Sequence, residues 1–388
     1  MIIRNGTVYD AVHAKPYVAD IVIRGGKIAA IGETIAAEEN EHVIDAAGMR
    51  VYPGLVEAHC HVGLHVYGLP GTDCDVNERN DITSAHLRAI DGFNPFDPGL
   101  RKALEAGITT IGTGPGSASV VGGTFMAVKT RGTCVDDMLV KNDVAMKCAL
   151  GENPKNCYGS TCDSTRMSTA AKLRELLFAA KDYSVEWLEA IANAPEGEKP
   201  KMPKRNMKLA AMRPVMEGEI PLKIHAHRAD DICTAIRIAK EFGVKLTIEH
   251  CSEGHLIVNE LVRAGVPVAV GPSMTNASKT ELANKSFETP GILAKAGVQV
   301  SIITDAPVIV QEYLPLCAGL AVKAGMDPFA ALQAITINPA KHLGIEDRVG
   351  SIEVGKDADL LIMTGVWNAV DSYPAKVLVD GKVVVDAE

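Results

Sequence analysis

Two histidines separated by one residue, His59 and His61, form the clearest chemical motif in the sequence. They end the apolar run GLVEAHCHV, which follows Pro53-Gly54 and is typical of a β-strand. Side chains at positions i and i+2 of a strand share one face, so both imidazoles can be directed at one ion. Because a lone His-x-His pair is also common as ordinary polar surface, further ligands are needed to indicate a metal site.

Three more residues with metal-binding side chains follow apolar, β-like runs later in the chain. His225 follows LKI, His250 follows LTIE, and Asp305 follows SIIT. If these runs are parallel strands of one barrel, their carboxyl ends meet at the mouth where the active sites of barrels lie. Any one of these residues could be a core histidine or a helix cap. Several strand ends that carry His or Asp favour one shared site.

Imidazole and carboxylate ligands suit Zn²⁺ best, and also Mn²⁺ or Fe²⁺. The sequence therefore predicts a divalent metal ion, with zinc first, as the cofactor. A catalytic ion keeps one coordination position open for water and lowers the pKa of that water toward neutrality. A carboxylate beside the water can accept its proton and return it to a leaving nitrogen. We predict that Asp305 is this general base and acid.

The strands that must position these residues alternate with helical segments between residues 53 and 349. The strand-like runs PLKIHAH, KLTIEHC, VPVAVG and VQVSIITDA are separated by the helix-like runs ADDICTAIRIAKEFG, HLIVNELVRAG and GILAKAG. This alternation predicts parallel strands joined by helical crossovers. Enough units fit for a closed (β/α)₈ TIM-like barrel, although the pattern alone also permits a doubly wound open sheet. Residues 152–220 hold helical segments and a Pro-rich turn, which predicts an insertion into the barrel.

Both ends of the chain have a different, β-rich pattern. Residues 1–52 contain short alternating runs broken by Asn-Gly and Gly-Gly pairs. Residues 350–388 contain similar runs and an Asp-Gly hairpin signal at Asp380-Gly381. We therefore predict a small β-sandwich domain built from both termini, residues 1–52 and 350–388, around a barrel domain of residues 53–349.

The net charge of −9 argues against nucleic acid or an anionic membrane as the main partner, because both need a basic footprint. The sequence shows neither a signal-peptide pattern nor a run that approaches the length of a membrane span. Nine cysteines without a paired Cys-x-x-Cys framework indicate reduced thiols. We expect a cytoplasmic protein that acts on a small molecule, and a homo-oligomeric state stays open.

The combined pattern resembles the amidohydrolase superfamily, and within it the imidazolonepropionase-related and prolidase-like members. That superfamily has a His-x-His after strand 1, single histidines after strands 5 and 6, and an Asp after strand 8. These positions are matched by His59 and His61, His225, His250, and Asp305. The segments VYPGLVEAHCHVG and AITINPAKHLGIEDRVGSIEVGKDADLLIM also match, so the resemblance spans nearly the whole chain. It implies a bent (β/α)₈ barrel and hydrolysis of a C–N bond in an amide, a cyclic amide or a peptide-like substrate.

The resemblance also implies a site for one or two divalent ions, in which His250 binds a metal where two ions are bound and polarises the substrate carbonyl where only one is bound. Where two ions are bound, it further implies a bridging ligand, either a carboxylated lysine or a glutamate. Lys147 in VAMKCALGENP is the candidate for a carboxylated lysine, since its alternate neighbours Ala149 and Gly151 are small. Glu152, in the same motif, is the competing ligand. The choice between Lys147 and Glu152, and between one and two ions, stays open at this point.

Four residues are predicted to contact the substrate. His227 shares a strand face with His225, at a position where the related imidazolonepropionases carry Glu, which implies a different substrate polarity. Arg228 can hold a substrate carboxylate, although a solvent-facing Arg at a helix start is an equal alternative. Ser117 and Thr124 lie in the glycine-rich segment GTGPGSASVVGGT and can form hydrogen bonds from a loop beside the site.

Other functions are consistent with parts of the pattern. A heterocycle deaminase uses the same scaffold and is the nearest alternative. A catalytically inactive oligomeric binding protein is less favoured, because every expected ligand is present. A Ser or Cys hydrolase is disfavoured because no Gly-x-Ser-x-Gly elbow is found and Cys60 lies between two candidate ligands. Sensitivity to chelators separates the metal-dependent functions from the thiol and serine ones.

Overall fold

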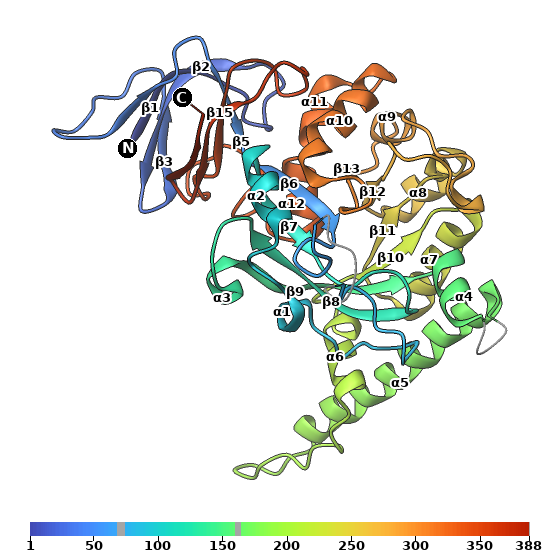
Figure 1. The fold of residues 1–388 in the computed structure, drawn as a ribbon. Helices are drawn as coiled ribbons and strands as arrows, with labels where there is room; N and C mark the ends of the chain where they lie inside the picture. Colours follow the sequence, from blue (N-terminus) through green and yellow to red (C-terminus); the bar gives the residue numbers. More distant parts are fainter. Residues whose placement is uncertain (68–73, 160–163, 388) are drawn as a thin grey trace.

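The computed structural model of this chain describes residues 1–67, 74–159 and 164–387. Its mixed α/β fold contains two eight-stranded sheets (Figure 1). One sheet is a nearly closed barrel formed by the middle of the chain, and the other contains strands from both ends. Residues 160–163 of the predicted insertion lie outside the described residues.

The barrel sheet follows the order of the chain, from β6 to β13. Its strands are β6 (Leu55–Cys60), β7 (Ile108–Thr113), β8 (Val121–Lys129), β9 (Leu139–Ala149), β10 (Leu222–Ala226), β11 (Leu246–His250), β12 (Val268–Val270) and β13 (Val300–Ile302). Except in β9, every residue of these strands is buried, as expected for a sheet covered on both faces. The first and last strands approach each other, and the amide of His61 donates to the carbonyl of Ala306 at 2.8 Å.

Strand β8 departs from the predicted parallel pattern. It pairs antiparallel with both β7 and β9, whereas the other neighbouring strands of this sheet are parallel. Only residues 114–120 join β7 to β8, which is too short for the helical crossover that a parallel strand needs. The prediction of eight strictly parallel strand–helix units is wrong at this strand. The doubly wound sheet is also wrong, because such a sheet does not follow chain order from edge to edge.

Helices cover the outside of the later strands (Figure 1). These are α7 (Ala229–Phe242), α8 (Val258–Ala264), α9 (Thr289–Lys295), α10 (Leu314–Lys323), α11 (Pro328–Gln333) and α12 (Ile337–Leu343). Helix α7 buries Ile232, Ala235 and Ile238, whose spacing puts them on the face that packs against β10 and β11. Within the described part of the chain, no helix is both long enough and apolar enough to cross a membrane.

Shorter elements fill the remaining connections. Helices α1 (Ala89–Gly92) and α2 (Pro98–Glu105) lie between β6 and β7, and α3 (Val135–Met138) lies between β8 and β9. Three 3₁₀ helices, η1 (Gly254–Leu256), η2 (Thr280–Leu282) and η3 (Gln311–Tyr313), follow β11, β12 and β13 respectively. The loops at the carboxyl ends of these strands are therefore partly ordered by short helical turns.

The long connection between β9 and β10 holds three helices, α4 (Glu152–Tyr158), α5 (Arg166–Ala192) and α6 (Met207–Met216). Helices α5 and α6 pack against each other. Figure 1 shows that the end of α5 and the loop after it point away from the barrel. Helix α4 lies near the carboxyl ends of the barrel strands, where Asn153 approaches His225, and Arg166 at the start of α5 pairs with Asp231 at the start of α7.

The second sheet joins both ends of the chain. Its strands are β1 (Ile2–Val8), β2 (Tyr17–Arg24), β3 (Lys27–Gly32), β4 (Val43–Asp45), β5 (Arg50–Pro53), β14 (Leu360–Met363), β15 (Pro374–Val379) and β16 (Lys382–Asp386). The order is β16-β15-β14-β5-β1-β2-β3, with β4 paired to β1. Strands β5 and β14 pair antiparallel and connect the N-terminal and C-terminal parts. The sandwich arrangement and the domain boundaries remain predictions.

Candidate active site

Five histidines and one aspartate converge at one end of the barrel. They lie in or just after strands β6, β10, β11 and β13, and they are His59, His61, His225, His227, His250 and Asp305. The ring centroids of His225 and His250 are 4.3 Å apart, and those of His59 and His250 are 5.2 Å apart. Residues separated by up to 246 positions in the chain thus share one small volume because parallel strands end at the same mouth.

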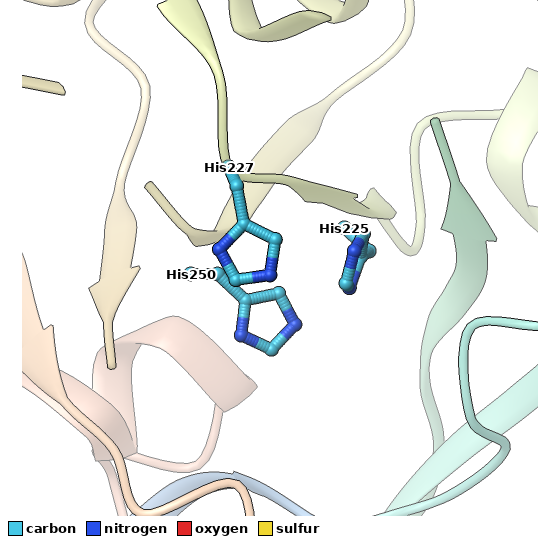
Figure 2. Close-up of side chains that lie close together, drawn as sticks. All are labelled: His225, His227 and His250. Atoms are coloured by element: carbon cyan, nitrogen blue, oxygen red, sulfur yellow. The ribbon is translucent and has the colours of Figure 1, made fainter. Parts of the chain in front are cut away.

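Two groups of side chains have ligand atoms close enough to hold a metal ion. The first consists of His225, His227 and His250, and Figure 2 shows their three imidazoles close together. The second consists of His59, His250 and Asp305. Within each group the ligand atoms lie within 4.8 Å of one another. Since His250 belongs to both groups, it lies between the two places where an ion could be held.

Backbone carbonyl groups fix the tautomers of two of these histidines. Nδ1 of His61 lies 2.7 Å from the carbonyl oxygen of Gly114, and Nδ1 of His250 lies 2.9 Å from that of Gly271. Because a carbonyl only accepts, each Nδ1 carries the proton and donates it, and each Nε2 keeps a lone pair. Nε2 of His250 is buried without a hydrogen-bond partner among the described residues. An unpartnered buried polar atom costs about 1–3 kcal/mol, a cost that a bound cation would remove.

His225 and His227, the other members of the first group of ligand atoms, each have a serine hydroxyl next to Nδ1. Nδ1 of His225 is 2.9 Å from Oγ of Ser117, and Nδ1 of His227 is 2.8 Å from Oγ of Ser252. Their Nε2 atoms are thereby left on the side of the ring away from these partners. The structure places the predicted Ser117 at this site, as the partner of a candidate ligand.

The buried histidines are held in the neutral form. Their pKa values lie well below the ordinary value of histidine, and burial is the largest cause, with the charges of neighbouring groups also acting. This applies to His59, His225, His227 and His250. Neutral imidazole is the form that binds a metal ion. The donor set therefore fits one or two divalent cations in residue type, protonation and orientation.

A buried ionic cluster lies behind His59 and is centred on Glu249. Oε2 of Glu249 accepts hydrogen bonds from Nδ1 of His59 at 3.0 Å and from Nζ of Lys223 at 2.8 Å. Oε1 accepts from Oγ1 of Thr247 and from Nε2 of His342, both at 2.8 Å. Burial alone would raise the pKa of Glu249, but Lys223 and His342 hold it well below its usual range. Glu249 is therefore ionised, and it orients the His59 ring so that Nε2 faces the site.

Lys147 lies beside the same cluster. It is fully buried in β9, in register with Lys223 of β10, and its Nζ is 3.2 Å from Nε2 of His59. Burial lowers the pKa of Lys147 to about 8, although the charge of Asp305 acts in the opposite direction. The structure thus brings the predicted lysine into contact with a candidate metal ligand.

Glu152 is not brought to the histidines. It begins helix α4 and belongs to neither group of ligand atoms, and only its backbone N–H reaches inward, donating to Glu281 at 3.0 Å. Gly151 has φ +85°, and a Cβ there would lie 2.8 Å from Oε2 of Glu281, so the chain turns where only glycine fits. Glu152 therefore lies outside both groups of ligand atoms, and its role as a ligand stays a prediction.

Glu281 is the carboxylate that approaches the histidines instead. It is fully buried, and its Oε1 lies 3.7 Å from Nε2 of His225 and 3.8 Å from Nε2 of His227. Lys279 pairs with the same carboxylate at 3.3 Å. No sequence pattern indicates Glu281, because it lies in the short helix η2 after β12, a region without hydrophobic periodicity.

The histidines open into a cavity of about 910 Å³. Its lining includes His61, His225, His227 and Asp305, and further residues such as Tyr67, Asn77, Ser117, Asn153 and Lys279. The amide of Asn153 lies 3.5 Å from Nε2 of His225. A cavity of this size is in the range of small-molecule sites, about 300–1,000 Å³.

Two predicted substrate contacts do not line this cavity. Thr124 is part of β8 and donates to Oδ1 of Asp143 at 2.6 Å. The guanidinium of Arg228 forms two hydrogen bonds with Asp230, at the start of α7. The sequence predicts a loop across the glycine-rich segment, but its last residues form strand β8, and Thr124 does not line the cavity. Arg228 is neutralised by a local carboxylate.

Two candidate ligands have a strained backbone. His250 has φ +74° and Asp305 has φ +55°, both in the left-handed region that side chains other than glycine rarely adopt. Such strain costs about 1–3 kcal/mol per residue, and it persists where the surrounding structure holds the residue in place. Its presence at two strand ends with ligand side chains favours a functional site over an ordinary buried polar cluster.

Comparisons with known proteins agree with this geometry. The model of the amidohydrolase family matches residues 50–384. The crystal structure of an amidohydrolase from Thermotoga maritima MSB8 is 38% identical, covers 99% of each chain and has a TM-score of 0.94. Amidohydrolase tasK from Hapsidospora irregularis is 27% identical over 95% of this chain and 40% of its own length. Adenine deaminase 1 from Latilactobacillus sakei is 23% identical over 94% of this chain and 54% of its own length. The chain thus spans about half the length of these two relatives.

Proposed function

The chain belongs to the amidohydrolase family, and we propose that it is a metal-dependent hydrolase that cleaves a C–N bond. The observation that carries this proposal is the set of imidazoles whose Nδ1 atoms have partners behind them while Nε2 of His250 has none. A bound divalent ion, Zn²⁺ first and Mn²⁺ or Fe²⁺ as alternatives, would supply Lewis acidity and lower the pKa of water there. The bond cleaved is an amide, a cyclic amide or a peptide-like bond.

We assign one ion position to His59, His61 and Asp305. Two distances support this: Nε2 of His61 lies 3.3 Å from Oδ1 of Asp305, and Nε2 of His59 lies 3.7 Å from the same oxygen. Glu249 supports the assignment from behind, because it fixes the orientation of His59. These three side chains together supply two imidazole nitrogens and one carboxylate, which is a donor set that zinc accepts.

We assign the second ion position to His225 and His250, with Lys147 or His227 as the further ligand. Lys147 would act as a carboxylated lysine, formed when its neutral amine adds to carbon dioxide and loses a proton. Its complete burial and its contact with His59 support this role. His227 is supported by the short distances between its ligand atoms and those of His225 and His250. Its role is then that of a ligand in addition to, or in place of, the substrate contact predicted from the sequence.

Asp305 is proposed as the general base and acid. It borders the cavity, and its Oδ1 has no hydrogen bond of good geometry, although His61 is near. Burial would raise the pKa of Asp305, but His61, His59 and Lys147 lower it below its usual value, so the carboxylate is ionised. An ionised carboxylate at this place can accept a proton from the attacking water and return it to the leaving nitrogen. Polarisation of the substrate carbonyl by His250 would require a proton on Nε2, whereas its hydrogen bond to Gly271 leaves a lone pair there, so we assign His250 as a metal ligand.

A heterocycle deaminase is the second candidate function. The adenine deaminase from Latilactobacillus sakei supports it, since that relative aligns with 94% of this chain. Both reactions add water to an unsaturated carbon that carries nitrogen, so both need the same base and the same metal. They differ in the product, since a deaminase releases ammonia from an exocyclic amine. Release of ammonia from aminated heterocycles, tested beside cleavage of small amides, cyclic amides and dipeptides, separates the two.

Metal content tests the proposal first. Protein purified without added metal is expected to hold about two divalent ions per chain by elemental analysis, as in two-metal hydrolase sites. Lys147→Ala should lower this number, whereas the matched variant Glu152→Ala, in the same segment, should leave it unchanged. About one ion that is indifferent to Lys147 would contradict the carboxylated lysine. Full activity after complete removal of metal would contradict the metal-dependent mechanism.

Three further properties stay proposals from the sequence. We infer a small-molecule substrate and a cytoplasmic location, and the oligomeric state stays open. We also infer that residues 1–52 and 350–388 form a small β-sandwich domain beside the barrel. The terminal sheet supports the domain proposal, because strands from both ranges pair within it.

A further inference from the structure

A second cavity, of about 970 Å³, lies at the opposite end of the barrel from the histidines. Its lining includes Pro221 and Leu246, at the amino ends of β10 and β11, and Pro267, just before β12. His225 and His250 lie at or near the other ends of β10 and β11. The two cavities have no lining residue in common. This second cavity, which we call the basal cavity, is therefore separate from the candidate active site.

The basal cavity is basic although the whole chain carries a net charge of −9. Two carboxylates line it, Glu219 and Glu260, against six cationic side chains: Lys141, Arg237, Lys240, Lys245, Arg263 and Lys341. Glu260 already has a cationic neighbour, since Arg263 lies 3.8 Å away. Within the described parts of the chain, Lys240, Lys245 and Lys341 form no ion pair, so their charges are available to an anion.

The basal cavity also has an apolar part. Val144, Leu246, Val266 and Leu343 line it together with the cationic side chains. Such a combination favours an occupant with a charged group and an apolar body over a bare inorganic ion, because each part of the lining then meets matching chemistry. The volume is also much larger than a bare ion needs.

Two of its lining residues contact the buried carboxylate behind His59. His342 is 5% exposed, its Nε2 donates to Glu249, and its Nδ1 has no hydrogen-bond partner among the described residues. Thr247 also lines the cavity and donates to the same carboxylate. Glu249 in turn accepts a hydrogen bond from His59. A bound molecule that moves His342 or Thr247 therefore acts on Glu249, which is hydrogen-bonded to the candidate metal ligand His59.

We propose that the basal cavity binds an organic phosphate, a dianion with an apolar body. The three unpaired lysines neutralise the phosphate, and the aliphatic side chains cover the body. A hydroxyl or N–H on the ligand can donate to Nδ1 of His342, which completes the hydrogen bonding of that ring. This binding site is additional to the proposed C–N hydrolysis and does not depend on it.

The test uses 1-naphthyl phosphate as a fluorescent probe of the metal-loaded protein, with 1-naphthol and inorganic phosphate as separate ligands. The probe should saturate one site with a dissociation constant below about 1 mM, which corresponds to roughly 4 kcal/mol of binding free energy. Each half alone should bind at least about tenfold more weakly, because it meets only part of the lining. Equal binding of inorganic phosphate would overturn the organic part of the proposal.

Variants locate the binding. Lys240→Gln/Lys245→Gln/Lys341→Gln should weaken binding of the probe at least about tenfold, since three cations next to the phosphate are lost. The matched control Lys181→Gln/Lys201→Gln/Lys204→Gln removes the same charge from exposed lysines in and after helix α5 and should leave the affinity within about twofold. Equal weakening in both triple variants would show attraction to net charge alone and would overturn the site.

Hydrogen exchange of the wild-type protein gives a second, independent location. The probe should protect residues 244–250 and 341–345, which contain lining residues of the basal cavity. Protection confined to the segments around His61 and His227 would place the probe in the histidine cavity and overturn the proposal. Neither measurement needs a substrate, so their outcome is independent of the proposed hydrolase function.

Discussion

The chain buries two clusters of polar side chains, one around the histidines and one around Lys129 of strand β8. Lys129 is 4% exposed, and its Nζ lies 2.7 Å from Asp359, 3.1 Å from Asp357 and 3.5 Å from Asp380. In this second cluster the cation is surrounded by carboxylates of the same chain. In the histidine cluster, Nε2 of His250 is buried without a partner among the described residues.

This difference separates a structural contact from a binding site. The Lys129 cluster joins a barrel strand to the segments beside β14 and β15, and its donors and acceptors lie in one chain. The histidine cluster is equally buried, but its lone pairs converge on a volume that its own donors do not fill. Burial is therefore a poor indicator of function by itself. The balance of donors and acceptors inside each cluster is the informative property.

Removing one carboxylate from each cluster should give the largest contrast. Asp305→Asn is expected to lower turnover about 10²–10⁴-fold, since the amide cannot accept the proton, while much of the metal stays bound. Asp359→Asn, the matched variant in the other cluster, should lower stability but keep turnover of the folded enzyme. Turnover near that of the wild type in Asp305→Asn, on any substrate found, would refute the assigned role.

Removing the cation from the Lys129 cluster should mainly change stability. Lys129→Met leaves buried carboxylates without their partner, and breaking a buried pair costs about 3–5 kcal/mol. Chemical denaturation measures this loss, and elemental analysis should find the metal content unchanged. Lys181→Met, an exposed lysine of α5, serves as control. Loss of metal without loss of stability would show that the two clusters are not separate in function.

Changing the carboxylate behind His59 should reduce metal affinity without removing a ligand. Glu249→Gln keeps the shape but removes the charge that orients His59, and loss of such an outer partner typically lowers affinity about 10–100-fold. Competition with a chromogenic chelator gives the affinity, and the exposed Glu241→Gln is the control. An affinity equal to that of the wild type would mean that His59 is oriented by its packing alone.

The smallest effect should be a change in the pH dependence of stability. Burial would raise the pKa of Asp357, but Lys129, Lys27 and Arg348 lower it below its usual value. Its contribution is therefore complete above the unfolded pKa of about 3.9 and is lost as pH falls through the lower folded pKa. When the pH is lowered from about 5 to about 3, the melting temperature of Asp357→Asn should fall by a few degrees less than that of the wild type. Parallel pH profiles of the two proteins would contradict this.

Sequence patterns could locate the residues of the candidate site that lie at strand ends. His59, His225, His250 and Asp305 each end or follow an apolar run, and the parallel strands bring such positions together whatever the loops do. Lys147 was predicted from the resemblance to amidohydrolases, which implies a bridging ligand, together with its small alternate neighbours Ala149 and Gly151. The alternation of strands and helices likewise predicted a barrel sheet.

The remaining parts depended on loop geometry and on contacts between strands, which local patterns do not encode. Glu281 comes from a short helical turn after β12, and no sequence pattern indicates the ion pair of Lys223 and Glu249 behind His59. Thr124 was misplaced because seven connecting residues reverse the chain direction before β8. For Glu281 and for the pair of Lys223 and Glu249, the deciding contact joins residues on different elements of the barrel.

The pairing of β5 with β14 has a consequence for how the chain folds during synthesis. Residues Arg50–Pro53 pair with Leu360–Met363, so the partner of β5 is made about 310 residues later. At about 5–20 residues per second, β5 leaves the ribosome roughly 15–60 seconds before β14 exists. During that time β5 has an unpaired edge, which can add strands from other chains. The nascent protein should therefore need chaperones until its last strands emerge, and truncation before β14 should cause aggregation.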